Sequence, residues 1–411
     1  MKIYGVLHEI KYSIIRAIAE RVVELNRKLP PEKRIINLTM GQNYIGNTSF
    51  VLERIGMLKS KNMGPFLYAP SLGTFEARES IAKWFYKLWY GVELDLSSVM
   101  ITDGAMGAIR NAMGAVVRDG DIVVVDPLTF IYVLDTLRVL GRKYRIEVID
   151  GGVDKKNYIP TPSMVIEFLQ DLSNKYPDKN IVYYTQFGFN PVGAFRSSSD
   201  LKKIVEFIDE SRNVFLINDI VYHLIRFGDL ENPLASYMSQ EGKNIVDCDS
   251  LSKPFSLMGL RVGAMITRDR EIFEAAAKVQ QYTIVSPNIL ACEVWKVVCD
   301  PEIFPMVKVE ISKLNTKLKE NYELLARSLQ SIGFKVISPG EGTLYIFADI
   351  GGEDSEKFVY ELIEKAGVAV VPGTAFEVKP RIGNRYIRVT ISFPREVLEE
   401  AVERLEDYFS R

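Results

Sequence analysis

The chain has 411 residues, with 51 lysines and arginines against 53 aspartates and glutamates, so its formal net charge is −2. This length is ample for a large buried core and predicts two to three structural units. Apolar residues make up 47% and charged residues 25% of the chain, as is typical of globular proteins. The balanced charge provides no long-range field of one sign, which disfavours nucleic acid and anionic membrane as partners.

Histidine and cysteine are scarce. His8 and His223 are the only two histidines, which excludes a metal centre built from several His ligands, and we expect no metal site. Cys248, Cys292 and Cys299 form no Cys-x-x-Cys pair, and their odd number argues against a disulfide framework. We interpret them as small core residues of a cytoplasmic protein. Proton chemistry in an enzyme of this composition therefore depends on Lys, Tyr, Asp or a cofactor.

The N-terminal 30 residues mix charges throughout and lack the uninterrupted apolar segment of a signal peptide. Their spacing predicts an amphipathic helix from about Lys11 to Lys28. No stretch approaches the ~18 apolar residues that a membrane span requires. Repeats and low-complexity tracts are also absent, which disfavours a solenoid or a disordered linker.

Between about residues 70 and 270, short apolar runs alternate with helical patterns. Such runs are typical of strands covered on both faces, so the segment predicts a mainly parallel α/β sheet. The helical patterns are Phe75–Trp89, Ala105–Val117, Tyr132–Leu140, Pro162–Leu172 and Ser199–Ser211. The strand candidates are Val99–Thr102, Ile122–Val125, Ile146–Ile149, Ile181–Thr185, Val214–Asp219, Ile245–Cys248 and Gly263–Thr267.

After about residue 285 the pattern changes to that of a smaller α+β unit. It comprises a long helix, Pro301–Ile332, and then strand Thr343–Asp349, helix Ser355–Ala366, strands Val368–Val371 and Tyr386–Ser392, and helix Pro394–Phe409. The N-terminal helix has no core of its own, and we expect it to pack on this unit. The predicted division is residues 1–45 with the small domain, 46–288 as the large domain and 289–411 as the small domain.

The segment from Ser250 to Gly263, Ser-Leu-Ser-Lys-Pro-Phe-Ser-Leu-Met-Gly-Leu-Arg-Val-Gly, is the most informative one. It places Lys253 just after a buried strand, beside the hydroxyls of Ser250 and Ser252 and before Arg261. A lysine in a desolvated pocket near another cation loses its proton readily and can form a Schiff base. The hydroxyls and the arginine suit a phosphate group. An exposed turn lysine is the structural alternative.

Several motifs in order resemble those of the class I and II aminotransferases, which are fold-type I enzymes that use pyridoxal 5′-phosphate (PLP). The Ser250–Gly263 segment is similar to their Ser-x-Ser-Lys and Gly-x-Arg-x-Gly motifs. The other similar motifs are Tyr68-Ala-Pro-Ser-Leu-Gly73, Gly104-Ala-Met-Gly-Ala108, Asn190-Pro-Val-Gly193, Asp219-Ile-Val-Tyr222 and Tyr386-Ile-Arg388. The resemblance extends over nearly the whole chain from about Asn37. It implies a fold-type I PLP transferase, with a seven-stranded mixed, mainly parallel sheet and a smaller α+β domain.

A phosphate cup is expected where a helix begins at Ala105, because free N–H groups and the positive end of the helix dipole bind anions. The resemblance implies that Gly104, Ala105, Met106, Ser250, Ser252 and Arg261 hold the phosphate, together with Tyr68 from a partner subunit of a homodimer. The family usually has a polar side chain near Met106, so here the backbone acts alone. Gly104 and Gly107 could instead serve close helix–strand packing.

The resemblance also implies how the cofactor ring is held. Asp219, at the end of an apolar strand, would keep the pyridine nitrogen protonated, which makes the ring a better electron sink. Tyr222 and Asn190 would bind the phenolic oxygen of the ring. The structural alternatives are a helix N-cap for Asp219 and a core position for Tyr222, and His223 is interpreted as structural. Phe130 is the predicted ring-stacking residue, with Tyr132 as the alternative, and an aromatic here is also common in a core.

Arg388 lies inside an apolar strand and therefore needs an anion. The resemblance implies a bidentate contact with the substrate carboxylate, and a structural ion pair is the alternative. Gly41 and Gln42 resemble the entry loop of the family, although its proline is missing. Gln42, Asn43 and Tyr44 are predicted to border the substrate side chain.

The predicted function is transfer of an amino group between an α-amino acid and a 2-oxo acid. The resemblance implies that Lys253 holds PLP as an aldimine and then moves a proton from the substrate Cα to C4′ of the cofactor. A β-elimination or carbon–sulfur lyase reaction is the alternative, because fold does not determine reaction. A partner-subunit arginine that binds dicarboxylates in animal-type aspartate enzymes has no counterpart in residues 279–294, which contain neither Arg nor Lys. Aromatic, branched and aminoadipate-like substrates remain open.

Overall fold

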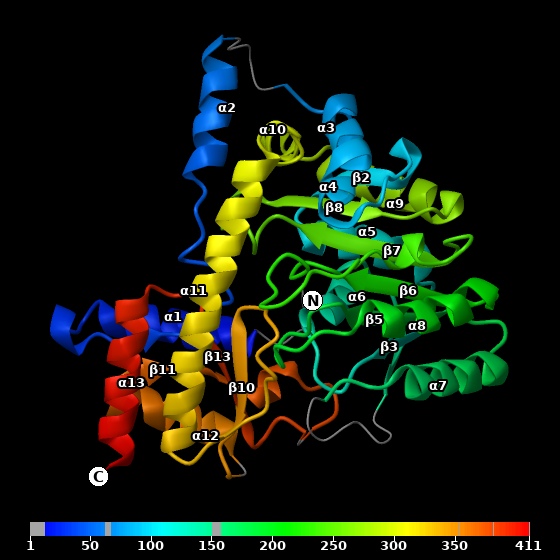
Figure 1. The fold of residues 1–411 in the computed structure, drawn as a ribbon. Helices are drawn as coiled ribbons and strands as arrows, with labels where there is room; N and C mark the ends of the chain where they lie inside the picture. Colours follow the sequence, from blue (N-terminus) through cyan, green and yellow to red (C-terminus); the bar gives the residue numbers. More distant parts are fainter. Residues whose placement is uncertain (1–12, 62–66, 150–157, 353, 381, 411) are drawn as a thin grey trace, which may run out of the picture.

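The computed structural model describes residues 13–61, 67–149, 158–352, 354–380 and 382–410, so His8 lies outside the described residues. Its main feature is a seven-stranded sheet in the order β2-β8-β7-β6-β5-β3-β4 (Figure 1). Strand β8 runs antiparallel to both neighbours, and the remaining pairs are parallel. The prediction of a mixed, mainly parallel sheet is therefore confirmed. The strands are β2 (Val99–Asp103), β3 (Ile122–Val125), β4 (Arg145–Val148), β5 (Ile181–Gln186), β6 (Val214–Asp219), β7 (Ile245–Ser250) and β8 (Val262–Ile266).

Both faces of this sheet are buried. Successive side chains of a strand point to opposite faces, and accordingly Val123 and Val125 join one hydrophobic core while Ile122 and Val124 join the other. The first core is closed by α5 (Ala105–Val116), α6 (Tyr132–Val139) and α9 (Arg270–Ile284). The second is closed by α3 (Phe75–Ser80), α7 (Pro162–Lys175), α8 (Ser198–Glu210) and α10 (Ile289–Val298).

The predicted helices are present, but Phe75–Trp89 is divided and three further helices were not predicted. The predicted helix Phe75–Trp89 consists of α3, a π-helical turn at Ile81–Phe85, and α4 (Tyr86–Tyr90). The sequence patterns did not predict α2 (Ser49–Lys61), α9 or α10. Helix α10 is apolar on almost every side and buries Trp295 completely, so it lacks the polar face that reveals a surface helix.

The remaining strands form two small sheets. One has the antiparallel order β12-β13-β10-β9, from Val371–Pro372, Tyr386–Thr390, Tyr345–Asp349 and Lys335–Val336. The other pairs β1 (Ile36–Asn37) with β11 (Val368–Ala369) in parallel. The single strand predicted at Val368–Val371 is thus divided between two sheets.

Helices α1 (Ile14–Asn26), α11 (Phe304–Ser331), α12 (Ser355–Glu361) and α13 (Arg395–Phe409) surround these small sheets (Figure 1). Helix α1 contacts β11 and β12. Within the described residues, no helix is long and apolar enough to cross a membrane.

Candidate active site

Polar side chains from several strands meet at one edge of the seven-stranded sheet. Asp219 ends β6, Ser250 ends β7, and Asn190 and Phe130 follow β5 and β3. Helix α5 begins at Ala105, directly after β2. Because the carboxyl ends of parallel strands share an edge, the sheet alone brings these groups together, at the place where α/β sheets bind ligands.

A cavity of about 450 Å³ lies at this edge. It contains 14 of the predicted residues, which are Gly41, Gln42, Ala105, Met106, Phe130, Tyr132, Asn190, Asp219, Tyr222, Ser250, Ser252, Lys253, Arg261 and Arg388. It is also lined by Val221 and Met258, which lie inside the quoted motifs but had no predicted role, and by Ser13, Ile15, Arg16, Met40, Ile109, Gln186 and Tyr345, which lie outside the motifs. Gly104, Asn43, Tyr44 and Tyr68 are outside this lining.

Lys253 is half-buried and lines the cavity. Its Nζ donates a hydrogen bond of 2.5 Å to the carbonyl oxygen of Gly41. Burial lowers the pKa of the Lys253 amine, and the charges of Arg388 and Arg261 also lower it, against the opposing effects of Tyr345 and Asp219. Asn43 donates through Nδ2 to the Lys253 carbonyl at 2.8 Å and so holds its backbone rather than the cavity. The lysine is therefore positioned and more readily deprotonated than a surface lysine.

One end of the cavity offers hydroxyls, a helix N-terminus and a guanidinium. Ser250 Oγ donates to Ser252 Oγ at 2.7 Å or to the Val262 carbonyl at 2.8 Å. Arg261 adopts a left-handed backbone conformation (φ 56°) and donates to the carbonyls of Met258 and Asp103. No carboxylate forms an ion pair with Arg261 in the part of the chain that the structure describes.

Gly104 supports this end from behind. It has φ +79°, and a Cβ there would lie 2.7 Å from Nη2 of Arg261. A side chain at position 104 would therefore displace the guanidinium. The predicted role beside an anion site and the alternative role in close packing are therefore both compatible with Gly104.

Asp219 is buried and lines the same cavity. Its Oδ2 accepts a hydrogen bond from the Tyr184 hydroxyl at 2.9 Å, and its Oδ1 accepts one from the Val221 N–H at 3.3 Å. Burial raises the pKa of the Asp219 carboxyl to about 6, against the opposing effect of the Tyr184 hydrogen bond. No helix begins after Asp219, so the predicted N-cap alternative does not apply.

Arg388 is buried and held by neutral groups. Its Nη1 donates to Asn190 Oδ1 at 2.9 Å and its Nη2 to the Thr39 carbonyl at 2.5 Å. Its Nε is buried without a hydrogen-bond partner, and within the described residues no carboxylate pairs with it. A buried arginine without an anion is costly, which argues against the structural ion pair and for an anionic ligand.

Tyr345 in β10 is a cavity residue that the motifs missed. Its hydroxyl lies 2.8 Å from the Tyr222 hydroxyl, and its ring lies 4.2 Å from the Arg388 guanidinium carbon. In the sequence, Tyr345 looks like an ordinary aromatic residue of an apolar strand, and no motif marks it. Gln186 was missed in the same way, and its Oε1 accepts from the Asn190 N–H at 3.2 Å.

Phe130 and Tyr132 both line the cavity, in edge-to-face contact with ring centroids 5.1 Å apart. The Tyr132 hydroxyl accepts a hydrogen bond from Ser13 Oγ at 2.5 Å, at the start of α1. Phe130 has no such polar contact and packs on the core that contains Ile109. This difference favours Phe130 as the residue free to cover a bound ring.

His223 and Tyr68 lie away from the cavity. His223 is fully buried, with Nδ1 2.6 Å from the Tyr90 hydroxyl and Nε2 3.2 Å from Asp249 Oδ2. His223 directly follows Tyr222, and Asp249 directly precedes Ser250, so this contact links the backbone segments beside two cavity residues. Tyr68 is 87% exposed.

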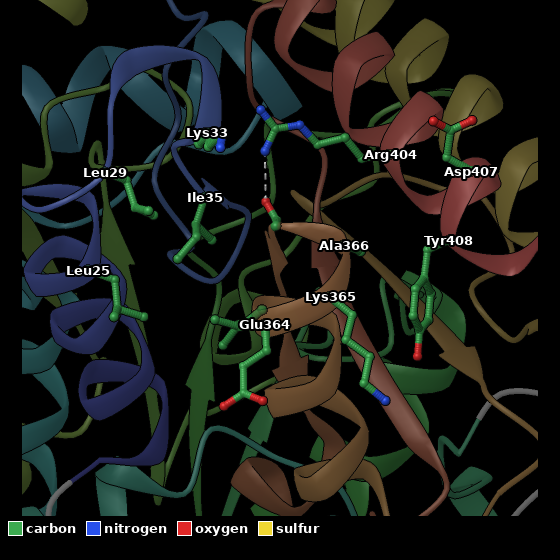
Figure 2. Close-up of a pocket in the computed structure, with 12 residues that line it drawn as sticks. Leu25, Leu29, Lys33, Ile35, Glu364, Lys365, Ala366, Arg404, Asp407 and Tyr408 are labelled. Carbon is green, nitrogen blue, oxygen red and sulfur yellow. Dashed lines mark hydrogen bonds between the residues drawn. The ribbon is translucent and has the colours of Figure 1, made fainter. Parts of the chain in front are cut away.

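A second, open hollow of about 580 Å³ lies where the end of α1 meets the π-helical turn at Leu362–Ala366 and α13 (Figure 2). Its lining includes the apolar Leu25, Leu29 and Ile35 and charged side chains of both signs. None of the predicted site residues lines it, and Arg404 in its lining donates a hydrogen bond to the Gly367 carbonyl. The chemistry-bearing groups are therefore gathered in the cavity at the sheet edge.

Comparison with known proteins identifies the family to which the chain belongs. The family described as aminotransferase class I and II matches residues 33–405. The aspartate aminotransferase of Pyrococcus horikoshii is 26% identical over 412 residues, which cover 97% of this chain and 94% of the relative. The LL-diaminopimelate aminotransferase of Halothermothrix orenii is 26% identical over 340 residues, covering 82% and 81%.

Solved structures show the same fold. An aminotransferase from Mycobacterium tuberculosis matches over 100% of both chains with a TM-score of 0.85 and 23% identity. The aspartate aminotransferase of Thermotoga maritima matches over 100% of both chains with a TM-score of 0.83 and 26% identity. These comparisons give no support to the lyase alternative. The chain therefore belongs to the class I and II aminotransferases, and it is an enzyme that moves an amino group between an α-amino acid and a 2-oxo acid.

Proposed function

We propose that the cavity at the sheet edge holds PLP on Lys253 and is the transamination site. The observation that supports this is the convergence of Lys253, Asp219, Arg388 and the Ser250–Arg261 cluster on one cavity of about 450 Å³. The groups suit the cofactor, because a hydroxyl and guanidinium end fits a phosphate and a buried carboxylate fits a protonated pyridine nitrogen. Arg388, which lacks an anion, is left for the substrate carboxylate.

In this proposal Gly104, Ala105, Met106, Ser250, Ser252 and Arg261 hold the phosphate. Phe130 covers the ring, Asp219 faces its nitrogen, and Tyr222 and Asn190 face its phenolic oxygen. Bound PLP supplies an electron-withdrawing ring that stabilises negative charge on the substrate Cα. Gly41 and Gln42 border the substrate, with Arg388 binding its carboxylate.

The protein's own contribution is proton transfer and orientation. The lowered pKa of Lys253 makes its neutral amine available as a general base at the substrate Cα and, once protonated, as a general acid. Arg388 and Asn190 share a hydrogen bond, so the carboxylate-binding group and the ring-binding group are set relative to each other. In this proposal the two groups together would orient the substrate so that its Cα faces Lys253.

Reduction with borohydride tests the proposal directly. Protein purified with PLP should be yellow, and borohydride should fix the cofactor to a peptide that contains Lys253. In a separate, unreduced sample, an amino donor alone should convert the cofactor to its amine form without release of ammonia, and 2-oxoglutarate added afterwards should convert it back. Protein that stays colourless and takes up no added PLP would contradict the proposal.

Arg388→Ala should raise the KM for amino donors by roughly 100-fold, because a charge-assisted, bidentate contact with the carboxylate is lost. Arg388→Lys should recover only part of this, since an ammonium cannot form the planar two-point contact. Steady-state kinetics over a range of donor concentrations measure the effect. An unchanged donor affinity in Arg388→Ala would overturn the carboxylate role.

Tyr184→Phe removes the hydrogen bond of 2.9 Å to Asp219 Oδ2, which holds the carboxyl pKa down. We expect the acid limb of the pH–rate profile to move upward by about one unit and kcat to fall several-fold, because a hydrogen bond to a charged group contributes about 1.5–3 kcal/mol. Tyr183→Phe is the matched control, because Tyr183 points to the opposite face of β5 and its hydroxyl donates to Asp126 instead of Asp219. Equal shifts in both variants would indicate a structural effect only.

We also propose a homodimer in which Tyr68 reaches the phosphate of the partner's site. Three large side chains in this region are mostly exposed: Tyr68 at 87%, Tyr282 at 86% and Leu67 at 71%. Gln280 of α9 donates to the Ser71 carbonyl at 2.5 Å, so these exposed apolar groups lie on neighbouring segments. Such a patch is typical of a buried interface. A monomer in sedimentation velocity at micromolar concentration would contradict this proposal.

For the domain division, we propose residues 1–45 with the small C-terminal domain, as α1 contacts β11 and β12 and β1 pairs with β11. The large domain begins at about residue 46. Helix α10 lies beyond the predicted boundary at 288 but contacts α3, β2 and β8, so we place the boundary between α10 and α11 instead. The three cysteines are buried and free, which supports the proposed cytoplasmic location.

A further inference from the structure

The segment between β1 and α2, residues 39–46, contacts both the proposed proton-moving group and the proposed carboxylate-binding group. The Thr39 carbonyl accepts a hydrogen bond of 2.5 Å from Nη2 of Arg388, and the Gly41 carbonyl accepts one of 2.5 Å from Nζ of Lys253. These two acceptors are two residues apart on one stretch of backbone. The segment, which we call the entry loop, therefore joins Lys253 to Arg388.

The entry loop is held to the residues that follow β13. Ser392 Oγ donates to the Gln42 carbonyl at 2.5 Å, and the Tyr44 N–H donates to the Ser392 carbonyl at 2.9 Å. The Tyr44 ring stacks on Phe393, with ring centroids 4.4 Å apart. Ser392 lies four residues after Arg388. The loop is thus fixed to the chain segment that carries the carboxylate-binding arginine.

Asn43 holds the same loop to Lys253. This residue is 3% exposed and does not line the cavity. Its Nδ2 donates to the Lys253 carbonyl at 2.8 Å, while its Oδ1 accepts from the N–H groups of Ile45 at 3.2 Å and Gly46 at 3.0 Å. An asparagine side chain can do both because it carries donors and acceptors. One carboxamide therefore closes the turn of the loop and fastens that turn to the backbone of Lys253.

The backbone at Lys253 has little other support. Lys253 lies in the turn between β7 and β8 rather than in a helix or strand, and the next residue, Pro254, has no N–H to donate. In the part of the chain that the structure describes, the Asn43 amide is the one hydrogen-bond donor to the Lys253 carbonyl. Gly46 packs so closely on Ser256 that an added Cβ would collide with its hydroxyl. Loss of the Asn43 carboxamide therefore frees the Lys253 backbone more than it would free a residue within a strand.

We infer that Asn43 is a positioning residue, which sets Lys253 relative to Arg388 through the entry loop. The inference rests on the proposed function, in which Lys253 moves the proton and Arg388 binds the substrate carboxylate. Asn43 itself touches neither substrate nor cofactor in this assignment. Its effect is on the geometry of proton transfer, where a displacement of about 1 Å can cost roughly 100-fold in rate. Binding of the donor carboxylate, which depends on Arg388, should change little.

Asn43→Ala tests this role, because alanine removes the bond to the Lys253 carbonyl and both bonds that close the turn. In PLP-loaded enzyme, kcat should fall by roughly 10- to 100-fold while the KM for the donor changes by less than about threefold. A donor with deuterium at Cα should show, in stopped-flow half-reactions, a primary isotope effect at least as large as in wild type. All rates are divided by the amount of bound PLP, so that misfolded protein does not contribute.

Asn43→Asp separates the two functions of the carboxamide. At neutral pH a carboxylate still accepts from the N–H groups of Ile45 and Gly46, but it cannot donate to the Lys253 carbonyl. The loss in kcat should therefore be at least as large as in Asn43→Ala. Activity near the wild-type level in Asn43→Asp would show that closing the turn is sufficient, and would overturn the link to Lys253.

Asn47→Ala is the matched control. Asn47 Oδ1 accepts from the Ser49 N–H at 3.0 Å in a similar turn, but its Nδ2 donates to Glu310 at 3.0 Å rather than to the Lys253 backbone. This variant should leave kcat and the isotope effect as in wild type. An equal loss in Asn47→Ala would overturn the role of Asn43, because any disturbance near the loop would then have the same effect.

A loss in Asn43→Ala that appears only in KM, or an isotope effect close to one in that variant, would also overturn the role. So would two Asn43 variants that take up no PLP, since Asn43 would then be needed for the fold itself. In each of these cases wild-type protein still transaminates, so the proposed function stands. Wild-type protein in which borohydride fixes no cofactor to Lys253 would instead contradict the proposed function and this inference together.

Discussion

Lys253→Ala is expected to lower the rate of amino transfer by roughly 10,000-fold, the upper range for loss of a positioned general acid–base group. The variant loses the proposed attachment point and the amine proposed to move the proton, while among the described residues the fold loses one side-chain hydrogen bond, to Gly41. Stopped-flow absorbance of the bound cofactor after mixing with donor measures the effect.

A small amine added to Lys253→Ala should restore part of the rate in proportion to its concentration, because it can occupy the emptied volume and carry the proton. Lys278→Ala is the matched control, since Lys278 is exposed on α9 and away from the cavity. A Lys253→Ala variant that retains more than about a tenth of the activity would assign the proton transfer to another group.

Asp219→Asn is expected to change activity and stability in opposite directions. With PLP bound, kcat should fall by roughly 100- to 1,000-fold, as for the loss of a placed electrostatic partner, because the amide cannot keep the ring nitrogen protonated. Activity assays at saturating PLP measure this loss. Retained activity would mean that Asp219 does not face the ring nitrogen.

Without PLP, the same variant should be more stable than the wild type at pH 8. Burial raises the folded-state pKa of Asp219 from 3.8 to about 6, so its contribution to stability is fully present below pH 4 and lost as the pH rises through 6. About two pKa units correspond to roughly 3 kcal/mol of unfolding free energy at pH 8. Urea unfolding of the PLP-free proteins at pH 4 and pH 8 measures it, and a gain at pH 4 alone would contradict the explanation.

The large sheet was predictable because its strands are buried on both faces. All seven predicted strands overlap those of the structure, since covered strands appear as short apolar runs between helices. Helix α10 was missed for the same reason, as it is apolar on nearly every side and its period is hidden. The spacing of apolar residues shows which face of an element is buried. When an element is buried on every side, this spacing no longer distinguishes a helix from a strand.

Some residues of the candidate site were predictable from the sequence and others were not. Lys253, Asp219, Arg261 and Arg388 are recognisable because charged residues beside or inside apolar strands need a ligand or partner. Tyr184 and Tyr345 resemble ordinary strand aromatics, and only the pairing of β5 with β6 places the Tyr184 hydroxyl on Asp219. Tyr345 reaches Tyr222 because β10 packs across from the turn after β6.

The sequence by itself determined the fold class, the family and the residues that we propose for cofactor chemistry, because these depend on local pattern and on motif order. Only the tertiary structure decided which groups face one another. It brought the first turn of α1, more than 370 residues before Arg388, to the same cavity. Such a contact depends on how distant elements pack, and packing leaves no local mark on the sequence of that turn.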